Sequence, residues 1–494
     1  MQRPGRSFVA IACTFVLIAA GCGGSSSPQA QGHFGNGSFS GSYAFVLSGK
    51  DASGFFAVAG SLQADGGGHI TRGTMDINAA AGVSTSVSFT GSYSVHPNGQ
   101  GSAQLVSPVR TFNIHFVLVS ASRAMLASFD ANTTGHGTAD LQSLTVLDNS
   151  ALAGQYAFNL AGVDVGANPL ATLGGLVADG AGTIASGVSD ASDNGVPSGD
   201  QPVTGTYSLA ASGRGTMTLT TSLGTLHFAF YPVSNRRFKL VETERSPALA
   251  GEATVGSNAS VSVPGCGPCV FRLSGIVGGK PFAAAGIFGT DDAGGITPNG
   301  FQDINTGAGA ASVGISGGSY GFAGNFHGTL SLRNGVTGVL SNYVIYPSAD
   351  GILFLCVDPG STVTGVATIQ AGAGLPFQDL SFQGAYAFSV SGTVLNGSTD
   401  VVGQVSASFT GHPTSTTPGT LTGALDINQA GVLTPNLVLD GSFTLDTNAR
   451  GTAALHTASG TQNVILYAAG PNSPLYFVGR DAGFVAAGSF DLQQ

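Results

Sequence analysis

The stretch Gly41-Ser42-Tyr43-Ala44-Phe45-Val46-Leu47-Ser48-Gly49 alternates large and small side chains between two framing glycines. In an extended chain successive side chains point to opposite faces, so the large ones share one face and the small ones the other. A period of two over this length is typical of a β-strand with one buried face. We therefore predict a half-buried strand here.

This stretch is the first of four copies. The later copies are Gly154-Gln155-Tyr156-Ala157-Phe158, Gly267-Pro268-Cys269-Val270-Phe271 and Gly384-Ala385-Tyr386-Ala387-Phe388. In each copy a second glycine follows the first by eight residues, and the copies begin 113, 113 and 117 residues apart. Recurrence at a nearly constant spacing indicates tandem units of one fold rather than a glycine-rich binding loop.

Three further motifs recur in the same order inside the units. A G-x-Y or G-x-F motif, ten residues before another glycine, begins at Gly91, Gly205, Gly318 and Gly441. An Asp-Ile-Asn motif begins at Asp76, Asp303 and Asp426, and the second unit keeps only its aspartate, Asp190. An acidic, glycine-rich turn begins at Ala64 and Ala178, with a looser copy at Asp291. Because four motifs keep one order, the repeat does not depend on any single motif.

The first unit is expected to contain eight sequential strands. Their predicted ranges are Ser42–Ser48, Phe55–Gln63, His69–Ile77, Ser84–Val95, Gly101–Val106, Thr111–Ser120, Ala124–Phe129 and Gly137–Leu141. Asp65-Gly66 and Asn98-Gly99 are hairpin signals, because both positions of such a turn need positive φ. Eight strands joined in order form an antiparallel meander, and closing it into a small up-and-down β-barrel removes the exposed edges. A two-sheet sandwich is the alternative.

The composition fits an all-β protein. Of the 494 residues 77 are glycine and only 9% are charged, and glycine costs about 1 kcal/mol against alanine inside a helix. Hydrophobic residues make up 42%, enough for real cores. Tandem units of about 110 residues are expected at 37–143, 150–256, 265–371 and 380–494. Each is large enough for its own core, so we expect beads on a string joined by short connectors.

The N-terminal segment carries an export pattern. Two arginines precede an apolar run, Phe8–Ala20, which is too short to span a bilayer as a mature helix. The run ends in Ile18-Ala19-Ala20-Gly21-Cys22, which resembles the lipobox of bacterial lipoprotein signals, with Ala19 where that family prefers leucine. The resemblance implies that residues 1–21 are a cleaved signal peptide and that Cys22 is acylated. An ordinary signal peptide with an incidental cysteine is the alternative.

The residues after the signal suit a membrane anchor. Residues 22–36 are expected to form a flexible tether, since Gly23-Gly24-Ser25-Ser26-Ser27-Pro28 is rich in glycine and serine. Several acyl chains, at ~0.8 kcal/mol per buried methylene, would attach Cys22 lastingly to a membrane. By the same resemblance, the uncharged Gly23 favours the outer membrane over retention at the inner membrane. We therefore predict an exported protein, lipid-anchored in the cell envelope, with the membrane as a partner.

Together these features resemble the repeat lipoproteins of Gram-negative soil bacteria, which combine a lipobox with units of G-x-Y-A-F, A-D-G-x-G and G-x-Y. The resemblance covers roughly residues 37–494. It implies tandem β units on a lipid anchor, and it brings no catalytic residues to this sequence.

Three cysteines remain once the signal is removed and Cys22 is acylated. Cys266-Gly267-Pro268-Cys269 has the spacing of thioredoxin-type motifs, but that chemistry needs a helix N-terminus and this motif opens a predicted strand. An exported protein is free to form a structural disulfide instead. At most one such bond can form within the chain, and three pairings stay open among Cys266, Cys269 and Cys356.

Other patterns of catalysis or metal binding are weaker. Two G-x-S-x-G matches start at Gly314 and Gly317, but a hydrolase elbow needs a following helix, which this context does not offer. Asp190–Gly195 vaguely resembles a calcium loop, and the Asp-Ile-Asn copies are suited to offer oxygen ligands or, more often, to cap turns. His115-Phe116 and His227-Phe228 lie on the same predicted strand of their units. The recurrent tyrosines are expected in the core, with a sugar site as the alternative.

The sequence therefore predicts no enzyme activity, cofactor or metal. The formal charge of −10, with scattered basic residues, argues against nucleic-acid binding. The expected function is a structural, adhesive or binding role in the envelope. One alternative is that the barrels bind a glycan or a small apolar ligand inside or at the mouth; an unidentified envelope protein is a further candidate partner. The other alternative is an enzyme activity confined to the divergent third unit.

Overall fold

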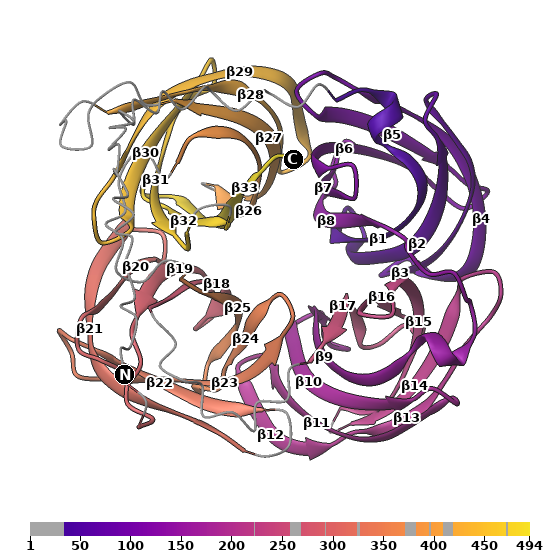
Figure 1. Cartoon of the computed structure of the whole chain (residues 1–494), viewed down its shortest axis with the longest axis horizontal. Coiled ribbons are helices and arrows are strands. Elements are labelled where there is room, and N and C mark those ends of the chain that lie inside the picture. The colour runs from indigo at the N-terminus through magenta and orange to yellow at the C-terminus, as the bar shows by residue number, and fades with distance from the viewer. Residues whose placement is uncertain are drawn as a thin grey trace, which may run out of the picture.

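The computed structural model describes residues 34–221, 223–256, 268–291, 293–323, 327–370, 382–394, 397–408, 418–470 and 473–494. Within these residues the chain forms four antiparallel β-barrels, each closed by pairing between its first and last strands. Figure 1 shows the barrels following one another around a common centre. The predicted all-β meander units are confirmed, and they are barrels rather than sandwiches.

Barrel 1 matches the strands predicted from the sequence, with ends that differ by at most three residues. Its strands are β1 (Ser40–Asp51), β2 (Gly54–Asp65), β3 (His69–Ala79), β4 (Gly82–Val95), β5 (Gln100–Val106), β6 (Thr111–Ser120), β7 (Arg123–Ser128) and β8 (Thr134–Leu141). The opening stretch forms β1, which pairs with β2 on one side and with β8 on the other. This double pairing leaves neither edge of the meander unpaired.

Barrel 2 repeats the order with one interruption. Its strands are β9 (Ala153–Val163), β10 (Pro169–Asp179), β11 (Thr183–Asp193), β12 (Val196–Pro202), β13 (Thr204–Leu209), β14 (Gly215–Thr221), β15 (Gly224–Ser234), β16 (Arg237–Glu242) and β17 (Ala248–Val255). The fourth strand of the barrel is split at Val203 into β12 and β13, and both parts pair with β11.

Barrels 3 and 4 keep eight strands each. Barrel 3 contains β18 (Cys269–Val277), β19 (Lys280–Phe288), β20 (Gly300–Asn305), β21 (Ala310–Phe322), β22 (Gly328–Asn334), β23 (Leu340–Ser348), β24 (Gly351–Cys356) and β25 (Ser361–Ile369). Barrel 4 contains β26 (Gly384–Val394), β27 (Gly397–Ser408), β28 (Gly419–Gln429), β29 (Val432–Leu445), β30 (Arg450–Thr457), β31 (Gly460–Ala468), β32 (Leu475–Gly479) and β33 (Phe484–Leu492).

The opening motif builds the interior of each barrel. Phe45 on β1 is buried and lies opposite Gly60 on β2. A β-carbon on Gly60 would lie 2.8 Å from the Phe45 ring, so the ring fills the space that the glycine leaves. The same cross-strand pair recurs as Phe158 with Gly174, Phe271 with Gly286, and Phe388 with Gly403. The repeated motif therefore specifies an aromatic core.

The G-x-Y tyrosines help to close one end of the first two barrels. The 3₁₀ turns η1 (Asn36–Ser38) and η2 (Asn149–Ala151) lead into Phe39 and Leu152, which are buried under the barrels just before their first strands. Tyr93 donates its hydroxyl hydrogen to the Phe39 carbonyl at 2.6 Å, and Tyr207 donates to the Leu152 carbonyl at 2.7 Å. These tyrosines are core residues, as predicted.

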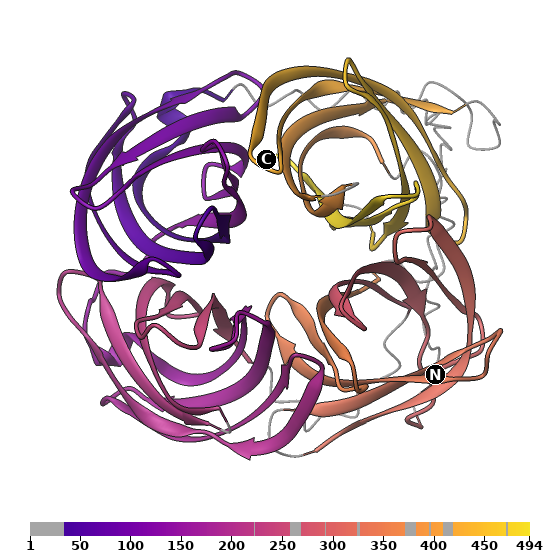
Figure 2. The same ribbon diagram turned by 180° about the vertical axis from the view of Figure 1, so that it is seen from behind.

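The barrels also pack against one another. Figures 1 and 2 show barrel 4 beside barrel 1, so the four barrels form a closed ring. At the first junction Ala57 and Ala59 of barrel 1 pack with Tyr231 and Val241 of barrel 2. Corresponding apolar clusters lie at the other three junctions. Each barrel has its own core, but the barrels are not independent beads.

Candidate functional site

The Asp-Ile-Asn motif lies on the third strand of its barrel and bonds to the next barrel. Asp76 on β3 is buried, and Arg214 of barrel 2 donates to it from Nε at 2.8 Å and Nη2 at 2.7 Å. The Tyr231 hydroxyl donates to the same carboxylate. The equivalent set between barrels 3 and 4 consists of Asp303, Arg450 and Tyr467. A buried carboxylate of one barrel is thus held by an arginine and a tyrosine of the next.

The third residue of the motif crosses the same junctions. Asn78 Nδ2 donates to the backbone carbonyls of Glu242 at 3.0 Å and Glu244 at 2.6 Å in barrel 2. The equivalent bonds run from Asn305 to the Gly479 carbonyl at 2.8 Å and from Asn428 to the Ser128 carbonyl at 2.7 Å. In barrel 2 Ser192 holds this position and donates to the Ser361 carbonyl at 2.6 Å. The motif is therefore an assembly element.

The junction that closes the ring, between barrels 4 and 1, uses different side chains. Gln100 and Val117 hold the paired strand positions that an arginine and a tyrosine hold at the junction of barrels 3 and 4. Val117 offers no hydroxyl, and Asp426 lies instead 3.2 Å from His115 Nδ1 and 3.4 Å from Gln100 Nε2. This junction therefore lacks the bidentate arginine contact that holds Asp76 at the junction of barrels 1 and 2 and Asp303 at the junction of barrels 3 and 4.

The pKa values of Asp303 and Asp190 shift in opposite directions at their junctions. Burial opposes the ionisation of Asp303, but hydrogen bonds led by the one from Arg450 outweigh it and lower the pKa of this carboxyl group. At the junction of barrels 2 and 3, Asp190 accepts hydrogen bonds from the Tyr346 hydroxyl and the Asp200 backbone N–H, which carry no positive charge. There burial dominates and raises the pKa of Asp190.

The residues considered as oxygen ligands serve the junctions and turns. Within the calcium-like segment, the Gly195 N–H donates to Thr362 Oγ1 of barrel 3 at 2.9 Å. Asn305 also caps a turn, because its Oδ1 accepts the Gly307 N–H at 2.8 Å. Throughout the part of the chain that the structure describes, no three His, Cys, Asp or Glu side chains gather in a way that could hold a metal ion.

A second polar network ties barrel 1 to barrels 2 and 3. Lys239 on β16 is buried and lies 2.6 Å from Asp140 on β8 and 2.6 Å from Glu252 on β17. Arg237 pairs with both Asp140 and Asp350 of barrel 3. Burial works against the ionisation of Glu252, but the nearby cations lower its pKa to about 2. Because these charges are paired with one another, we assign the network a role in holding the barrels together.

Glu242 gives the first junction a testable pH dependence. It is buried beside Asn78, and burial raises the pKa of its carboxyl group from 4.5 to about 7, although the His227 and Glu244 N–H groups bond it. Because the pKa of Glu242 is higher in the folded than in the unfolded protein, the folded state binds its proton more tightly. The stability that this proton contributes is complete below the unfolded-state pKa and is lost as the pH rises through the folded-state pKa.

The wild-type protein should therefore lose about 1–3 kcal/mol of unfolding free energy between about pH 5 and pH 8, relative to Glu242→Gln. Denaturant unfolding across this range measures the difference. Glu244→Gln, at the more exposed neighbour, should keep most of the wild-type slope, because the Glu244 charge adds to the shift but burial of Glu242 is its largest cause. Parallel pH profiles for wild type and Glu242→Gln would contradict the assignment.

The cysteine candidates lie in barrel 3. Cys269 on β18 and Cys356 on β24 are buried in its core, and no disulfide joins the two. Burial raises the pKa of the Cys356 thiol to about 11, which disfavours a reactive thiolate. Cys266 and Cys22 lie outside the described residues. Lipidation and the disulfide pairing therefore stay predictions.

The serine and histidine candidates are not brought together. Ser319 on β21 lies 3.0 Å, Oγ to Oγ, from Ser331 on β22, so the matching G-x-S-x-G segment runs into another strand and not into a helix. His115 lies at the ring-closing junction, whereas His227 lies 3.4 Å from Glu244 in barrel 2. The two histidines lie on equivalent strands but not at equivalent positions, since Ala229 holds the place of His115 in barrel 2, and they have no common chemical role.

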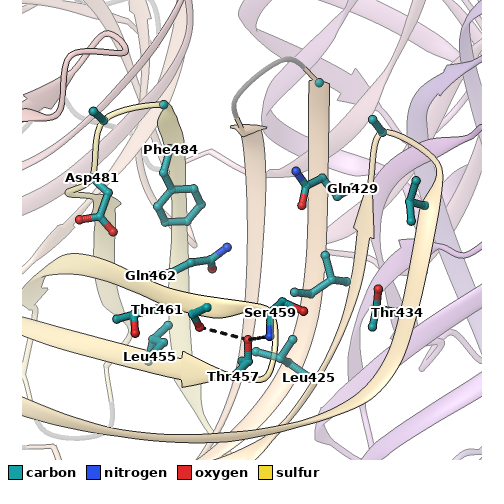
Figure 3. A pocket seen from close by; sticks show the side chains of 17 residues that line it. Leu425, Gln429, Thr434, Leu455, Thr457, Ser459, Thr461, Gln462, Asp481 and Phe484 are labelled. Carbon is teal, nitrogen blue, oxygen red and sulfur yellow. Dashed lines mark hydrogen bonds between the residues drawn. The ribbon is translucent and has the colours of Figure 1, made fainter.

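The mouth of barrel 4 holds a pocket of about 730 Å³ (Figure 3). Its floor is made by core side chains, namely Leu425, Ile427, Leu455 and Phe484. Its rim is formed by polar residues of β28–β31 and their turns, namely Gln429, Thr434, Thr457, Ser459, Thr461 and Gln462. The recurrent Tyr and Phe positions of the opening motif do not appear among its described lining residues. A concave site of this size, apolar inside and polar at the edge, is typical of small-molecule binding.

The same mouth is filled in barrel 1. There the Arg110 guanidinium lies 4.9 Å from the Phe56 ring and 4.6 Å from the Phe112 ring, and it pairs with Asp51 at 2.8 Å. Phe112 pairs with Leu105 on β5, and Gln462 pairs with Leu455 at the equivalent place in barrel 4. The sequence motifs missed this site because it arises from smaller side chains between the motifs.

The comparisons with known proteins add no family. No protein-family model matches the chain, and no curated protein matches it. Among solved structures, the P pilus usher (PapC) translocation pore aligns over 91% of this chain and 98% of its own, at 8% identity and a TM-score of 0.13. A score of that size carries no argument about fold or function. The described residues contain no helix that is both long and apolar enough for a membrane span.

Proposed function

We propose that this chain is a lipid-anchored protein of the cell envelope whose four barrels form one non-catalytic platform with a structural, adhesive or binding role. The observation that carries the proposal is the use of the recurrent carboxylates. The aspartates at one position of all four barrels, Asp76, Asp190, Asp303 and Asp426, each contact the following barrel. Side chains engaged in this way hold an assembly together and are not free to act on a substrate.

The anchor is supported by the sequence. Cys22 follows a lipobox-like segment, and the glycine- and serine-rich tether predicted over residues 22–36 leads into the first turn of barrel 1, which begins at Asn36. A tether of this composition holds a folded body away from the membrane without fixing its orientation. The proposal therefore places the barrel ring at the membrane surface through its N-terminal end.

Labelled palmitate tests the anchor. The wild-type protein should incorporate the label and sediment with membranes, whereas Cys22→Ala should lose the label because its thiol acceptor is gone. Cys266→Ala, which removes another thiol of the mature chain, should keep the label. A wild-type chain that takes up no label, or a Cys22→Ala chain that still does, would refute lipidation at this residue.

A second candidate function is small-molecule binding in barrel 4. It is supported by the pocket of about 730 Å³ in the mouth of this barrel. The two functions are compatible, because the pocket residues Asp481, Gly483 and Phe484 contact barrel 3 through backbone groups, and these contacts leave the mouth of barrel 4 open. The ring would then present the binding barrel on a rigid support.

A further inference from the structure

We infer that the mouth of barrel 4 binds a neutral, hydroxyl-rich ligand with one apolar face, the chemistry of an uncharged sugar ring. The inference rests on the proposed binding role of this pocket and adds the class of ligand. Three properties of the lining carry it: its charge, its unused hydrogen-bonding groups and its floor.

The lining offers no partner to a charged ligand. Asp481 is the charged residue among the described lining residues, and it lies in the turn between β32 and β33. Its carboxylate already accepts the Asn463 backbone N–H at 2.7 Å and the Asn463 amide at 3.0 Å. An anionic ligand would find no lysine or arginine there, and a cationic ligand would find only this engaged carboxylate.

The rim carries hydrogen-bonding groups that the protein does not use. In the described part of the chain, the side-chain amides of Gln429 and Gln462 and the hydroxyl of Thr434 have no hydrogen-bond partner, and all three are partly buried at the pocket. Figure 3 shows Gln462 on one side of the pocket with Gln429 and Thr434 on the opposite side. An amide offers both donors and an acceptor, which matches ligand hydroxyl groups that do the same.

The floor selects for an apolar face. Leu425, Leu455 and Phe484 are each at most 5% exposed and close the pocket below the polar rim. A purely aliphatic ligand would use this floor but would cover the two rim amides without bonding them, which carries a desolvation cost. A ring with C–H groups on one face and hydroxyls at its edge satisfies both parts of the site.

The test uses the full-length mature protein and a matched set of probes. Glucose, galactose, mannose and their disaccharides would be titrated by ligand-observed NMR, beside the uronates and amino sugars with the same rings and 1-octanol as an apolar probe. At least one neutral sugar should bind, and its charged counterparts should bind at least about tenfold more weakly, since no charge partner repays their desolvation.

Two variants locate the binding. Gln462→Phe copies the residue that fills this mouth in barrel 1, so it should fold and abolish sugar binding. Thr422→Phe adds the same ring at an exposed position of β28 outside the described pocket lining, and it should bind like wild type. Circular dichroism of both variants confirms that the barrels are intact.

Each other outcome overturns the inference. Equal or tighter binding of the uronates or amino sugars would show that the ligand class is wrong. Binding of 1-octanol alone, lost in Gln462→Phe, would keep the binding role of the pocket and reject the sugar chemistry. Sugar binding that survives Gln462→Phe would place the site elsewhere. No binding by any probe would remove the proposed binding role together with its ligand class.

Discussion

Replacing Asp303 by alanine should lower the free energy of unfolding by about 2–4 kcal/mol, because it leaves a partly buried guanidinium and a buried hydroxyl without their acceptor. Asp303 has 0% exposure and accepts Arg450 Nε at 2.8 Å and Nη2 at 2.9 Å, together with the hydroxyls of Ser312 and Tyr467. The loss falls on the junction of barrels 3 and 4, so the ring should loosen there first. Denaturant unfolding followed by circular dichroism measures the change.

The pH dependence of this variant has a definite sign. The pKa of Asp303 is lowered in the folded protein, so its contribution is present above the ordinary aspartate pKa and is lost as pH falls through the lowered one. The gap between wild type and Asp303→Ala should therefore narrow below about pH 4. Asp440→Ala, at an exposed position of β29, is the matched control and should stay within about 0.5 kcal/mol of wild type. A loss below about 1 kcal/mol in Asp303→Ala would contradict the assembly role.

Gly49→Ala should cost about 3 kcal/mol or more, because the first and last strands of barrel 1 pass too close together at this point for a side chain. A β-carbon on Gly49 would lie 1.9 Å from the Thr134 carbonyl oxygen and 2.4 Å from Gly135 Cα on β8. Both obstacles are backbone atoms, so relief requires shifting the strand pair that closes the barrel. In the other three barrels a β-carbon on the equivalent glycine would lie 1.9–2.3 Å from a backbone carbonyl oxygen of the last strand. These glycines are Gly162, Gly275 and Gly392.

A second glycine substitution tests whether the loss of stability comes from the closure of barrel 1 or from replacing any strand glycine. Gly314→Ala, on β21, places a β-carbon with nothing within 4 Å and should change stability by less than about 1 kcal/mol. Thermal unfolding of the two variants beside wild type makes the comparison. If Gly49→Ala were as stable as Gly314→Ala, the close approach of β1 and β8 would not be what requires the glycine.

The strands were predictable because their signal is local. Alternation of large and small side chains has the period of an extended chain, and Asp65-Gly66 fits only a tight turn, so neighbouring residues alone place β1 to β8. The choice between a barrel and a sandwich could not be predicted from neighbouring residues. It depends on whether β1 pairs with β8, some ninety residues later, and both folds share the same strand pattern.

The candidate sites were less predictable than the strands. The sequence showed that Asp76 recurs, but its partner Arg214 is 138 residues away and belongs to another unit. Oxygen ligands and turn capping were therefore the natural interpretations, and capping holds for Asn305. The pocket of barrel 4 was hidden for a different reason. It depends on small or polar residues such as Gln462 replacing the aromatic side chain that fills barrel 1.

The repeated stretch that begins at Gly41 thus contains its own strand, its large-side-chain face and its glycine frame, since all three follow from side-chain alternation and size within nine residues. The requirement for its second glycine depends on the tertiary structure, because only the folded chain places the Thr134 carbonyl against Gly49. The closed ring of four barrels and the pocket of barrel 4 likewise depend on the tertiary structure. These features arise from contacts between residues far apart in the chain, and no local pattern carries the geometry of such contacts.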